Sequence, residues 1–462
     1  MCIIINQLQD IIPEMKALGS FHIYIMHLYS SNRLMQGKEK MLKDITWKRY
    51  VGMEEVMEII KGGVTAPKGY KAAGIYAGIK KKKKDMALVY STVSANAAGT
   101  FTTNLVKAAP VIWDMNIVEK FGKARAVVLN SGVANACTGE LGTLNNEKMA
   151  VSMAEELGLK KEEVLTASTG VIGKQLPIDI IGEGCKLLAA NLGEETEYGD
   201  LAAEAIMTTD TFVKQYAVSF VIDGITVTLG GMAKGSGMIH PNMATMLGVI
   251  TTDLAISKEL LLTAIREDVK DSFNMVSVDR DTSTNDSLII LANGLAGNKE
   301  ITEEDGNYKL FAQALRKVTT ELSKMMASDG EGATKLFECT VKGADSKDQA
   351  VILSKSIITS NLVKTAVYGN DANWGRILCA MGYAGVAFAP DKVDLFIESS
   401  AGTLKLVENG MATDYSEETA TEILKQKEVK AIADIKSGSC EATAWGCDLT
   451  DGYIKINADY RS

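Results

Sequence analysis

The sequence predicts an α/β fold. From Met86 onward, short apolar stretches of strand length alternate with segments whose apolar residues recur at helical spacing. Of the 462 residues, 46% are hydrophobic and 41 are glycine, a composition typical of a soluble protein with mixed strands and helices. The length is enough for two or three domains with full cores.

The first clear elements follow Met86. Residues 86–93 and 124–129 are apolar strand candidates. Asn146 is predicted to cap a helix, because methionine and leucine residues recur at every fourth position after it. A methionine stripe of this kind is more often core filling than part of a cofactor site.

A predicted hairpin occupies the middle of the chain. Residues 216–222 and 225–229 alternate in strand fashion around Asp223-Gly224, the sequence of a tight two-residue turn. The hairpin runs directly into a glycine-rich block that begins at Lys234. We therefore expect this block to be attached to a sheet rather than to a loose loop.

Downstream elements follow in the same alternating order, with a hydrophilic break at residues 294–306. The sequence predicts a strand at 247–250, a helix capped by Ser257, a strand at 287–292, a helix at 308–326, a strand near 336–341, a helix from Ser346 into the 360s, and further short strands.

Charge and cysteine usage exclude several classes of function. The formal charge is 49 minus 58, or −9, which gives no general affinity for nucleic acid or anionic membranes. The one basic run, residues 80–84, is better explained as a solvated turn between two strands than as an anion site. Seven scattered cysteines without Cys-x-x-Cys spacing favour reduced thiols over disulfides or a zinc site. With no apolar run of ~18 residues and no secretory signal, we expect a cytoplasmic protein without a metal centre.

The glycine-rich block reads Lys-Gly-Ser-Gly-Met-Ile-His-Pro-Asn-Met-Ala-Thr-Met-Leu-Gly-Val-Ile over residues 234–250. It brings Thr245 to the start of an apolar strand, where a nucleophile can be held rigidly. Taken alone, Thr245 is a β-branched residue that opens a buried strand, and strand threonines are common. His240, in the same block, is assigned a structural role.

The whole block resembles the signature of the ornithine acetyltransferase family, in which a precursor of the acetylated arginine pathway cleaves itself between Ala and Thr. Here the matching pair is Ala244 and Thr245. Cleavage would leave Thr245 with a free α-amine beside its hydroxyl. An amine with a pKa near ~7.7–8.0 can activate that hydroxyl at neutral pH.

The resemblance extends from about residue 62 to 462 and implies the other site residues. The oxyanion donors would be Thr169 and Gly170, within Thr-Ala-Ser-Thr-Gly-Val-Ile-Gly. Substrate contacts would be made by Thr208, Lys234, Thr245, Glu331, Asn457 and Ser462. Ser462 stands where the family usually ends in Thr, and the hydroxyl survives. A polar network at residues 281–286 is expected to support the nucleophile.

The resemblance further implies stacked layers of sheet and helix, a self-cleaved site with an N-terminal nucleophile, and a smaller C-terminal α/β domain. We expect an extension outside the family at residues 1–52, a catalytic domain at 53–293 and the C-terminal domain at 294–462. The cleaved α and β chains would form an α₂β₂ assembly. The expected substrates are N²-acetyl-L-ornithine and L-glutamate, with acetyl-CoA as a further acetyl donor in many family members and no resident cofactor.

Two alternatives remain open. A self-processing aminopeptidase or amidase would use the same nucleophile but pass the acyl group to water. An unprocessed relative would serve as a binding protein. Glutamate dependence of acetyl-ornithine consumption separates the first alternative from acetyl transfer, and the presence of two fragments divided after Ala244 excludes the second.

Overall fold

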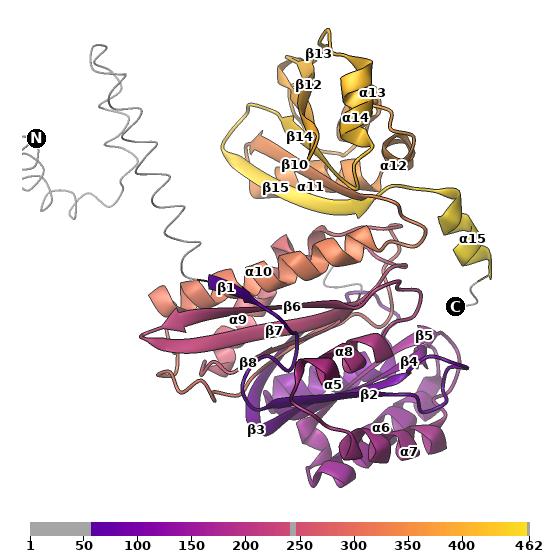
Figure 1. Cartoon of the computed structure of the whole chain (residues 1–462), viewed down its shortest axis with the longest axis vertical. Helices are drawn as coiled ribbons and strands as arrows, with labels where there is room; N and C mark the ends of the chain where they lie inside the picture. Colours follow the sequence, from indigo (N-terminus) through magenta and orange to yellow (C-terminus); the bar gives the residue numbers. More distant parts are fainter. Residues whose placement is uncertain (1–56, 241–245, 460–462) are drawn as a thin grey trace, which may run out of the picture. The chain divides into compact units, whose positions relative to one another are not determined.

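The computed structural model describes residues 57–240 and 246–459 (Figure 1). The predicted extension at 1–52 lies outside the described residues, as do Ala244, Thr245 and Ser462. Glu58 begins a compact unit that extends to the end of the chain. From Glu58 onward, every described element belongs to this unit, and the predicted domain limits stay predictions.

The larger sheet follows the order β1-β6-β7-β8-β9-β3-β4-β5, with β2 added beside β3. Neighbouring strands are antiparallel in most pairs, but β4 with β5 and β8 with β9 are parallel. The strands are β1 (Met57–Ile60), β2 (Tyr70–Ile75), β3 (Met86–Phe101), β4 (Lys123–Val133), β5 (Val164–Val171), β6 (Lys214–Ile222), β7 (Ile225–Lys234), β8 (Leu247–Thr252) and β9 (Ser287–Ala292).

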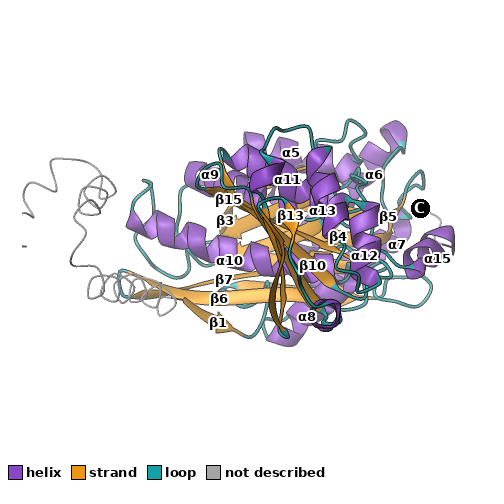
Figure 2. Cartoon of the chain, turned by 90° about the horizontal axis from the view of Figure 1, so that it is seen from above, coloured by secondary structure: helices purple, strands orange, loops and turns teal. Residues whose placement is uncertain are grey.

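Helices pack on this sheet in layers. Successive residues of a strand point to opposite faces, so Ala87 and Val89 of β3 join one apolar core while Met86 and Leu88 join another. Helices α6 and α7 supply the core on the second side, and α10 lies along β6 and β7 (Figures 1 and 2). The helices are α5 (Ala109–Lys120), α6 (Gly139–Leu157), α7 (Ile178–Ala190), α8 (Thr196–Ala205), α9 (Lys258–Asp268) and α10 (Gly306–Ser328).

The C-terminal part of the chain builds a second sheet in the order β13-β12-β11-β14-β10-β15. Its strands are β10 (Leu336–Ala344), β11 (Asp394–Ser399), β12 (Gly402–Glu408), β13 (Met411–Ala412), β14 (Glu428–Asp434) and β15 (Cys440–Cys447). Its helices are α11 (Lys347–Thr359), α12 (Asn361–Tyr368), α13 (Trp374–Gly382), α14 (Glu417–Leu424) and α15 (Asp451–Asp459). The predicted α/β class is thereby confirmed for both sheets.

Local signals located several elements correctly. The Asp223-Gly224 turn joins β6 to β7, with φ angles of 50° and 80° that suit a tight hairpin turn. The Ser257 hydroxyl accepts a hydrogen bond from the backbone N–H of Leu260 and so caps α9. The strand predicted at 287–292 matches β9 at both ends.

Two element predictions were wrong. Asn146 does not cap a helix, because α6 begins at Gly139 and holds Asn146 in its buried face, where its amide donates to the Thr166 hydroxyl. The helix predicted to run from Ser346 into the 360s is broken at Ser360. That residue has extended backbone angles, and its hydroxyl accepts from the N–H of Val363 to start α12.

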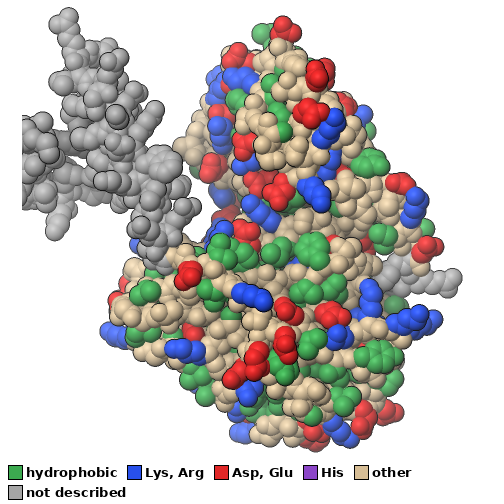
Figure 3. Space-filling model, in the orientation of Figure 1, with side chains coloured by type: hydrophobic (Ala, Val, Ile, Leu, Met, Phe, Trp, Pro, Cys, Tyr) green, Lys and Arg blue, Asp and Glu red, His purple; other side chains and the backbone are tan. Residues whose placement is uncertain are grey.

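In the described part of the chain, no single helix has the length and apolar character of a membrane span. Together, the adjacent helices α11 and α12 do reach that length and apolar character, but they are bent by 58° relative to each other. On the face drawn in Figure 3, acidic and basic side chains intermingle, so neither sign dominates there.

Three residues that are aligned across neighbouring strands of the larger sheet position the site. Lys234, the last residue of β7, pairs with Leu247 at the start of β8, and Leu247 pairs with Ser287 at the start of β9. The glycine-rich connection therefore begins at the end of β7 and ends at the adjacent start of β8, on the same side of the sheet.

Candidate active site

A cavity of about 170 Å³ opens on this side of the sheet. All six predicted site residues that the structure describes line it, although they come from segments far apart in the sequence. They are Thr169, Gly170, Thr208, Lys234, Glu331 and Asn457.

Thr169 and Gly170 lie near the end of β5, where the strand meets β4. Gly170 has a φ of +127°, and a Cβ at this position would lie 2.4 Å from the carbonyl carbon of Gly132. Only glycine fits this close approach of two backbones. Because Gly170 has no side chain, its backbone can stay at the cavity wall beside the Thr169 hydroxyl.

Lys234 supplies a buried cation. Its Nζ donates to the Thr169 hydroxyl oxygen over 3.3 Å. Burial lowers the pKa of Lys234, and the nearby carboxylate of Asp210 works against this shift. A partly desolvated ammonium of this kind binds a carboxylate strongly, because little water competes for it.

Glu331 supplies an anion in the same cavity. Its Oε2 accepts a 2.7 Å hydrogen bond from the Asn457 amide of α15, and its backbone N–H donates to the carbonyl oxygen of Ser236. A Cβ on Gly237 would lie 2.3 Å from the Glu331 carboxyl carbon, so Gly237 leaves the room that this carboxylate occupies. The cavity therefore holds a cation and an anion, a pattern suited to an amino acid.

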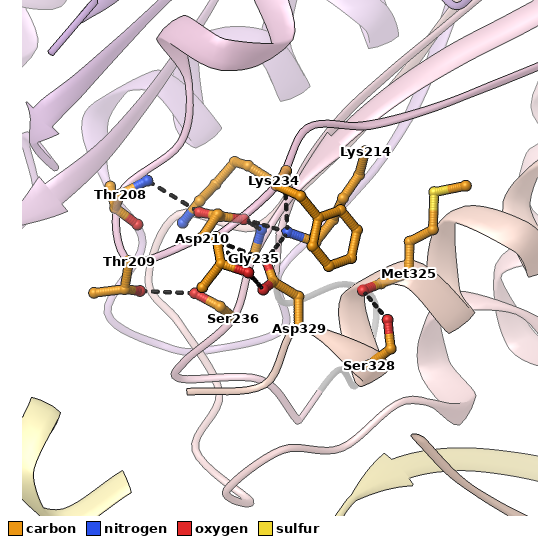
Figure 4. Close-up of polar contacts among 12 residues, drawn as sticks. Thr208, Thr209, Asp210, Lys214, Lys234, Gly235, Ser236, Met325, Ser328 and Asp329 are labelled. Carbon is orange, nitrogen blue, oxygen red and sulfur yellow. Dashed lines mark hydrogen bonds and ion pairs between the residues drawn. The ribbon is translucent and has the colours of Figure 1, made fainter. Parts of the chain in front are cut away.

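A buried ion cluster stands behind these groups (Figure 4). Lys214, fully buried, donates to Asp210 over 2.7 Å and to Asp329 over 2.5 Å. The second oxygen of Asp210 accepts from the backbone N–H of Thr208, and its first oxygen accepts from that of Gly235. Burial raises the pKa of Asp210, but the charges of Lys234 and Lys214 outweigh this and hold it below its usual value. The cluster thus fixes the segments that carry Thr208, Lys234 and Glu331.

Asn285 connects two further walls of the cavity. Its amide nitrogen donates to the carbonyl oxygens of Ala134 and Ser168, and its side-chain oxygen accepts from the Thr284 hydroxyl. The sequence singled out residues 281–286 as a polar support, and Thr284 to Asp286 do line the cavity. The connection of Asn285 to β5, the strand that carries Thr169, could not be read from the sequence.

His240 lies beside this region with its Nδ1 3.0 Å from the Ser277 hydroxyl. Burial, followed by the charges of Lys355 and Arg280, lowers the pKa of His240 to about 4. A neutral imidazole hydrogen-bonded to a serine fits the structural role predicted for it.

Comparison with known proteins decides the family. The model of the ArgJ family matches residues 71–462. The chain belongs to the ArgJ family. This membership confirms the predicted family and the expected class of enzyme, an acyltransferase of arginine biosynthesis.

Curated ArgJ relatives match almost their whole length. The arginine biosynthesis bifunctional protein ArgJ of Caldanaerobacter subterraneus subsp. tengcongensis is 50% identical over 406 residues, which cover 88% of this chain and 100% of the relative. The protein of the same name from Thermotoga neapolitana is 51% identical over 398 residues, covering 86% of this chain and 99% of the relative.

Two solved structures are also similar in sequence. An arginine biosynthesis bifunctional protein from Bacillus halodurans is 41% identical, with a TM-score of 0.39, and covers 41% of this chain and 99% of its own. An ornithine acetyltransferase from Mycobacterium tuberculosis, solved with ornithine, is 40% identical, with a TM-score of 0.37, and covers 41% of this chain and 100% of its own.

Proposed function

We propose that this ArgJ family member transfers an acetyl group from N²-acetyl-L-ornithine to L-glutamate through an acetyl ester on Thr245. One observation carries the proposal. Thr169 and Gly170, the expected oxyanion donors, line the same cavity as Met246, the residue that follows Thr245 in the sequence. Lys234 and Glu331 add the two charges that an amino-acid substrate requires.

The first stage is self-cleavage. The Thr245 Oγ attacks the carbonyl carbon of Ala244, and the bond from that carbon to the Thr245 nitrogen breaks, which frees the amine and leaves an ester. Water then hydrolyses the ester. The products are an α chain that ends in the carboxylate of Ala244 and a β chain that begins with Thr245.

The second stage is acetyl transfer in two half-reactions. The Thr245 amine takes the hydroxyl proton while Oγ attacks the acetyl carbonyl, and the Thr169 hydroxyl and Gly170 N–H stabilise the oxyanion. The proton passes to the α-nitrogen of ornithine, which leaves. The α-amine of glutamate then attacks the acetyl ester, the bond from the acyl carbon to Oγ breaks, and the Thr245 amine carries the proton from the glutamate nitrogen to Oγ as N-acetylglutamate departs. Ornithine leaves before glutamate binds, so the kinetics are ping-pong.

Charge orients the substrates in this scheme. Lys234 binds the α-carboxylate that both amino acids carry, and Glu331 binds the side-chain ammonium of ornithine. Thr208 and Asn457, which both line the cavity, complete the contacts, and Ser462 contributes a hydroxyl. No cofactor is needed, since the threonine carries the acyl group.

We extend the proposal to the surroundings of the enzyme. The α and β chains form an α₂β₂ heterotetramer in the cytoplasm, and acetyl-CoA serves as a second acetyl donor for glutamate. Size measurement of the purified protein and an assay with acetyl-CoA in place of acetyl-ornithine test these points separately.

The main test is an assay of acetyl-ornithine consumption with and without glutamate. Acetyl transfer predicts that glutamate is required. It also predicts that double-reciprocal plots of initial rate against acetyl-ornithine concentration, measured at several glutamate concentrations, give parallel lines. Equal consumption without glutamate would instead support the amidase alternative. A Thr245→Ala protein that still transfers acetyl groups would refute the assignment of the nucleophile.

A further inference from the structure

The basic run at residues 80–84 contains two lysines that are partly buried, Lys80 and Lys84, and Lys84 pairs with Glu204 over 2.8 Å. The run joins β2 to β3, as expected for a turn between strands, and Lys81, Lys82 and Lys83 are exposed. Lys80 is partly buried instead, and its Nζ donates a 2.9 Å hydrogen bond to the carbonyl oxygen of Met207. The solvated-turn interpretation therefore holds for the three exposed lysines but not for Lys80, whose ammonium bonds a backbone carbonyl, or for Lys84, which is ion-paired.

The turn itself is built to place Lys80. Asp85, fully buried immediately before β3, accepts hydrogen bonds from the backbone N–H groups of Ala77, Gly78 and Lys80 over 2.6, 3.1 and 2.9 Å. Three donors on one carboxylate hold the turn in a single conformation. The backbone of Lys80 is thus fixed before its side chain makes any contact.

The stem of Lys80 packs against Gly132 of β4, the strand that pairs with β5, which carries Thr169 and Gly170. A Cβ on Gly132 would lie 3.0 Å from the Lys80 Cγ, and a Cβ on Gly170 would lie 2.4 Å from the Gly132 carbonyl carbon. Lys80 therefore contacts Gly132, and Gly132 contacts Gly170. The lysine stem lies next to Gly132, and Gly132 pairs with Gly170 on the neighbouring strand.

The ammonium of Lys80 holds one half of a single peptide group. The peptide between Met207 and Thr208 presents its oxygen to Lys80 Nζ and its N–H to Asp210 Oδ2, which lies 3.0 Å away. A peptide group bonded at both ends cannot rotate without breaking a charge-assisted hydrogen bond. Because Thr208 lines the cavity, the orientation of this peptide sets the position of Thr208.

We propose that Lys80 is a positioning residue for acetyl transfer: it ties the Met207-Thr208 peptide to the backbone of Gly132, the strand partner of the oxyanion-hole residue Gly170. This inference rests on the proposed function, because it assigns Thr208 to the substrate. Lys80 does not line the cavity and acts through Thr208. Its removal is expected to weaken substrate binding more than the chemical step.

The test compares Lys80→Met with Lys82→Met, a matched loss of charge two residues away on the exposed part of the run. Lys80→Met keeps the stem over Gly132 but loses the ammonium. We expect its KM for N²-acetyl-L-ornithine to rise about tenfold, the size expected for one charge-assisted hydrogen bond, with kcat changed less than about threefold. Lys82→Met should match the wild type, and Lys80→Arg should recover most of the loss.

Two further readouts separate the possible failures. Calorimetric titration with ornithine should show weaker binding to Lys80→Met than to Lys82→Met, whether or not acetyl transfer is observed. Equal KM and equal ornithine affinity in these two variants would overturn the role of Lys80, and a wild type that binds ornithine but transfers nothing would overturn the proposed function alone. A fall of many degrees in the melting temperature of Lys80→Met with an unchanged KM would show a merely structural role and overturn the inference.

Discussion

The ammonium nitrogen of Lys234 lies 3.3 Å from the hydroxyl oxygen of Thr169, across 65 residues of sequence. The hydroxyl accepts this bond, so its own hydrogen is free to point into the cavity. A hydroxyl that accepts from a cation becomes a stronger donor, because hydrogen bonds in a chain polarise one another. Lys234 can thus serve both as a carboxylate contact and as a support for the oxyanion donor.

Thr169→Val should lower kcat by about 10²–10³ with little change in KM, because it removes one oxyanion donor at nearly constant volume. Thr169→Ser keeps the hydroxyl and should retain most of the activity. Steady-state kinetics of the two purified proteins provide the comparison. Equal rates for the valine and serine variants would remove Thr169 from the oxyanion site.

Lys234→Met should raise the KM for both N²-acetyl-L-ornithine and L-glutamate by about 10- to 100-fold, since both substrates carry the α-carboxylate that the cation binds. Lys234→Arg should restore only part of the affinity, because the guanidinium is larger and planar. Separate titrations of the two substrates measure the effect. A change confined to one substrate would contradict a shared carboxylate contact.

Glu331→Gln should discriminate between the substrates. Loss of the carboxylate weakens binding of the ornithine side-chain ammonium, and we expect the KM for N²-acetyl-L-ornithine to rise about tenfold. The KM for L-glutamate should stay the same or fall, because the side-chain carboxylate no longer meets a like charge. Asn457→Ala, which removes the amide that holds Glu331, should act in the same direction and less strongly. An equal rise for both substrates would argue against this assignment.

Lys214→Met should destabilise the fold, because it leaves the buried carboxylates of Asp210 and Asp329 without their shared cation. Breaking a buried ion pair in this way typically costs about 3–5 kcal/mol in the free energy of unfolding. Lys270→Met is the matched control, since Lys270 pairs with Glu267 at the surface and should change stability by less than about 1 kcal/mol. Urea unfolding of both variants measures the difference, and equal stabilities would contradict a structural role for the cluster.

Local sequence signals predicted the elements whose cause is local. The Asp223-Gly224 turn and the Ser257 cap depend on neighbouring residues alone, and both were placed correctly. Asn146 was misplaced because its partner, the Thr166 hydroxyl, lies on a strand that the sequence does not show as adjacent. A buried side-chain contact there outweighs the usual preference of asparagine for a helix start.

The residues of the site likewise fall into a predicted group and a group that was not predicted. The resemblance of the glycine-rich block and its companions named six residues that the structure brings to one cavity. The supporting contacts were not predictable, because they join distant segments: Lys214 reaches Asp329 across 115 residues, and Lys80 reaches Met207 across 127. The residues next to a lysine in the sequence do not show whether its ammonium bonds a distant buried group or is hydrated at the surface.

The most direct test of the central claim is N-terminal sequencing of the purified, active protein, combined with intact-mass analysis. Self-cleavage at the proposed position predicts two chains, one of which begins Thr-Met-Leu-Gly, with masses that add up to the precursor plus one water. Active protein that contains only an uncut chain, or whose second chain begins elsewhere, would contradict the account.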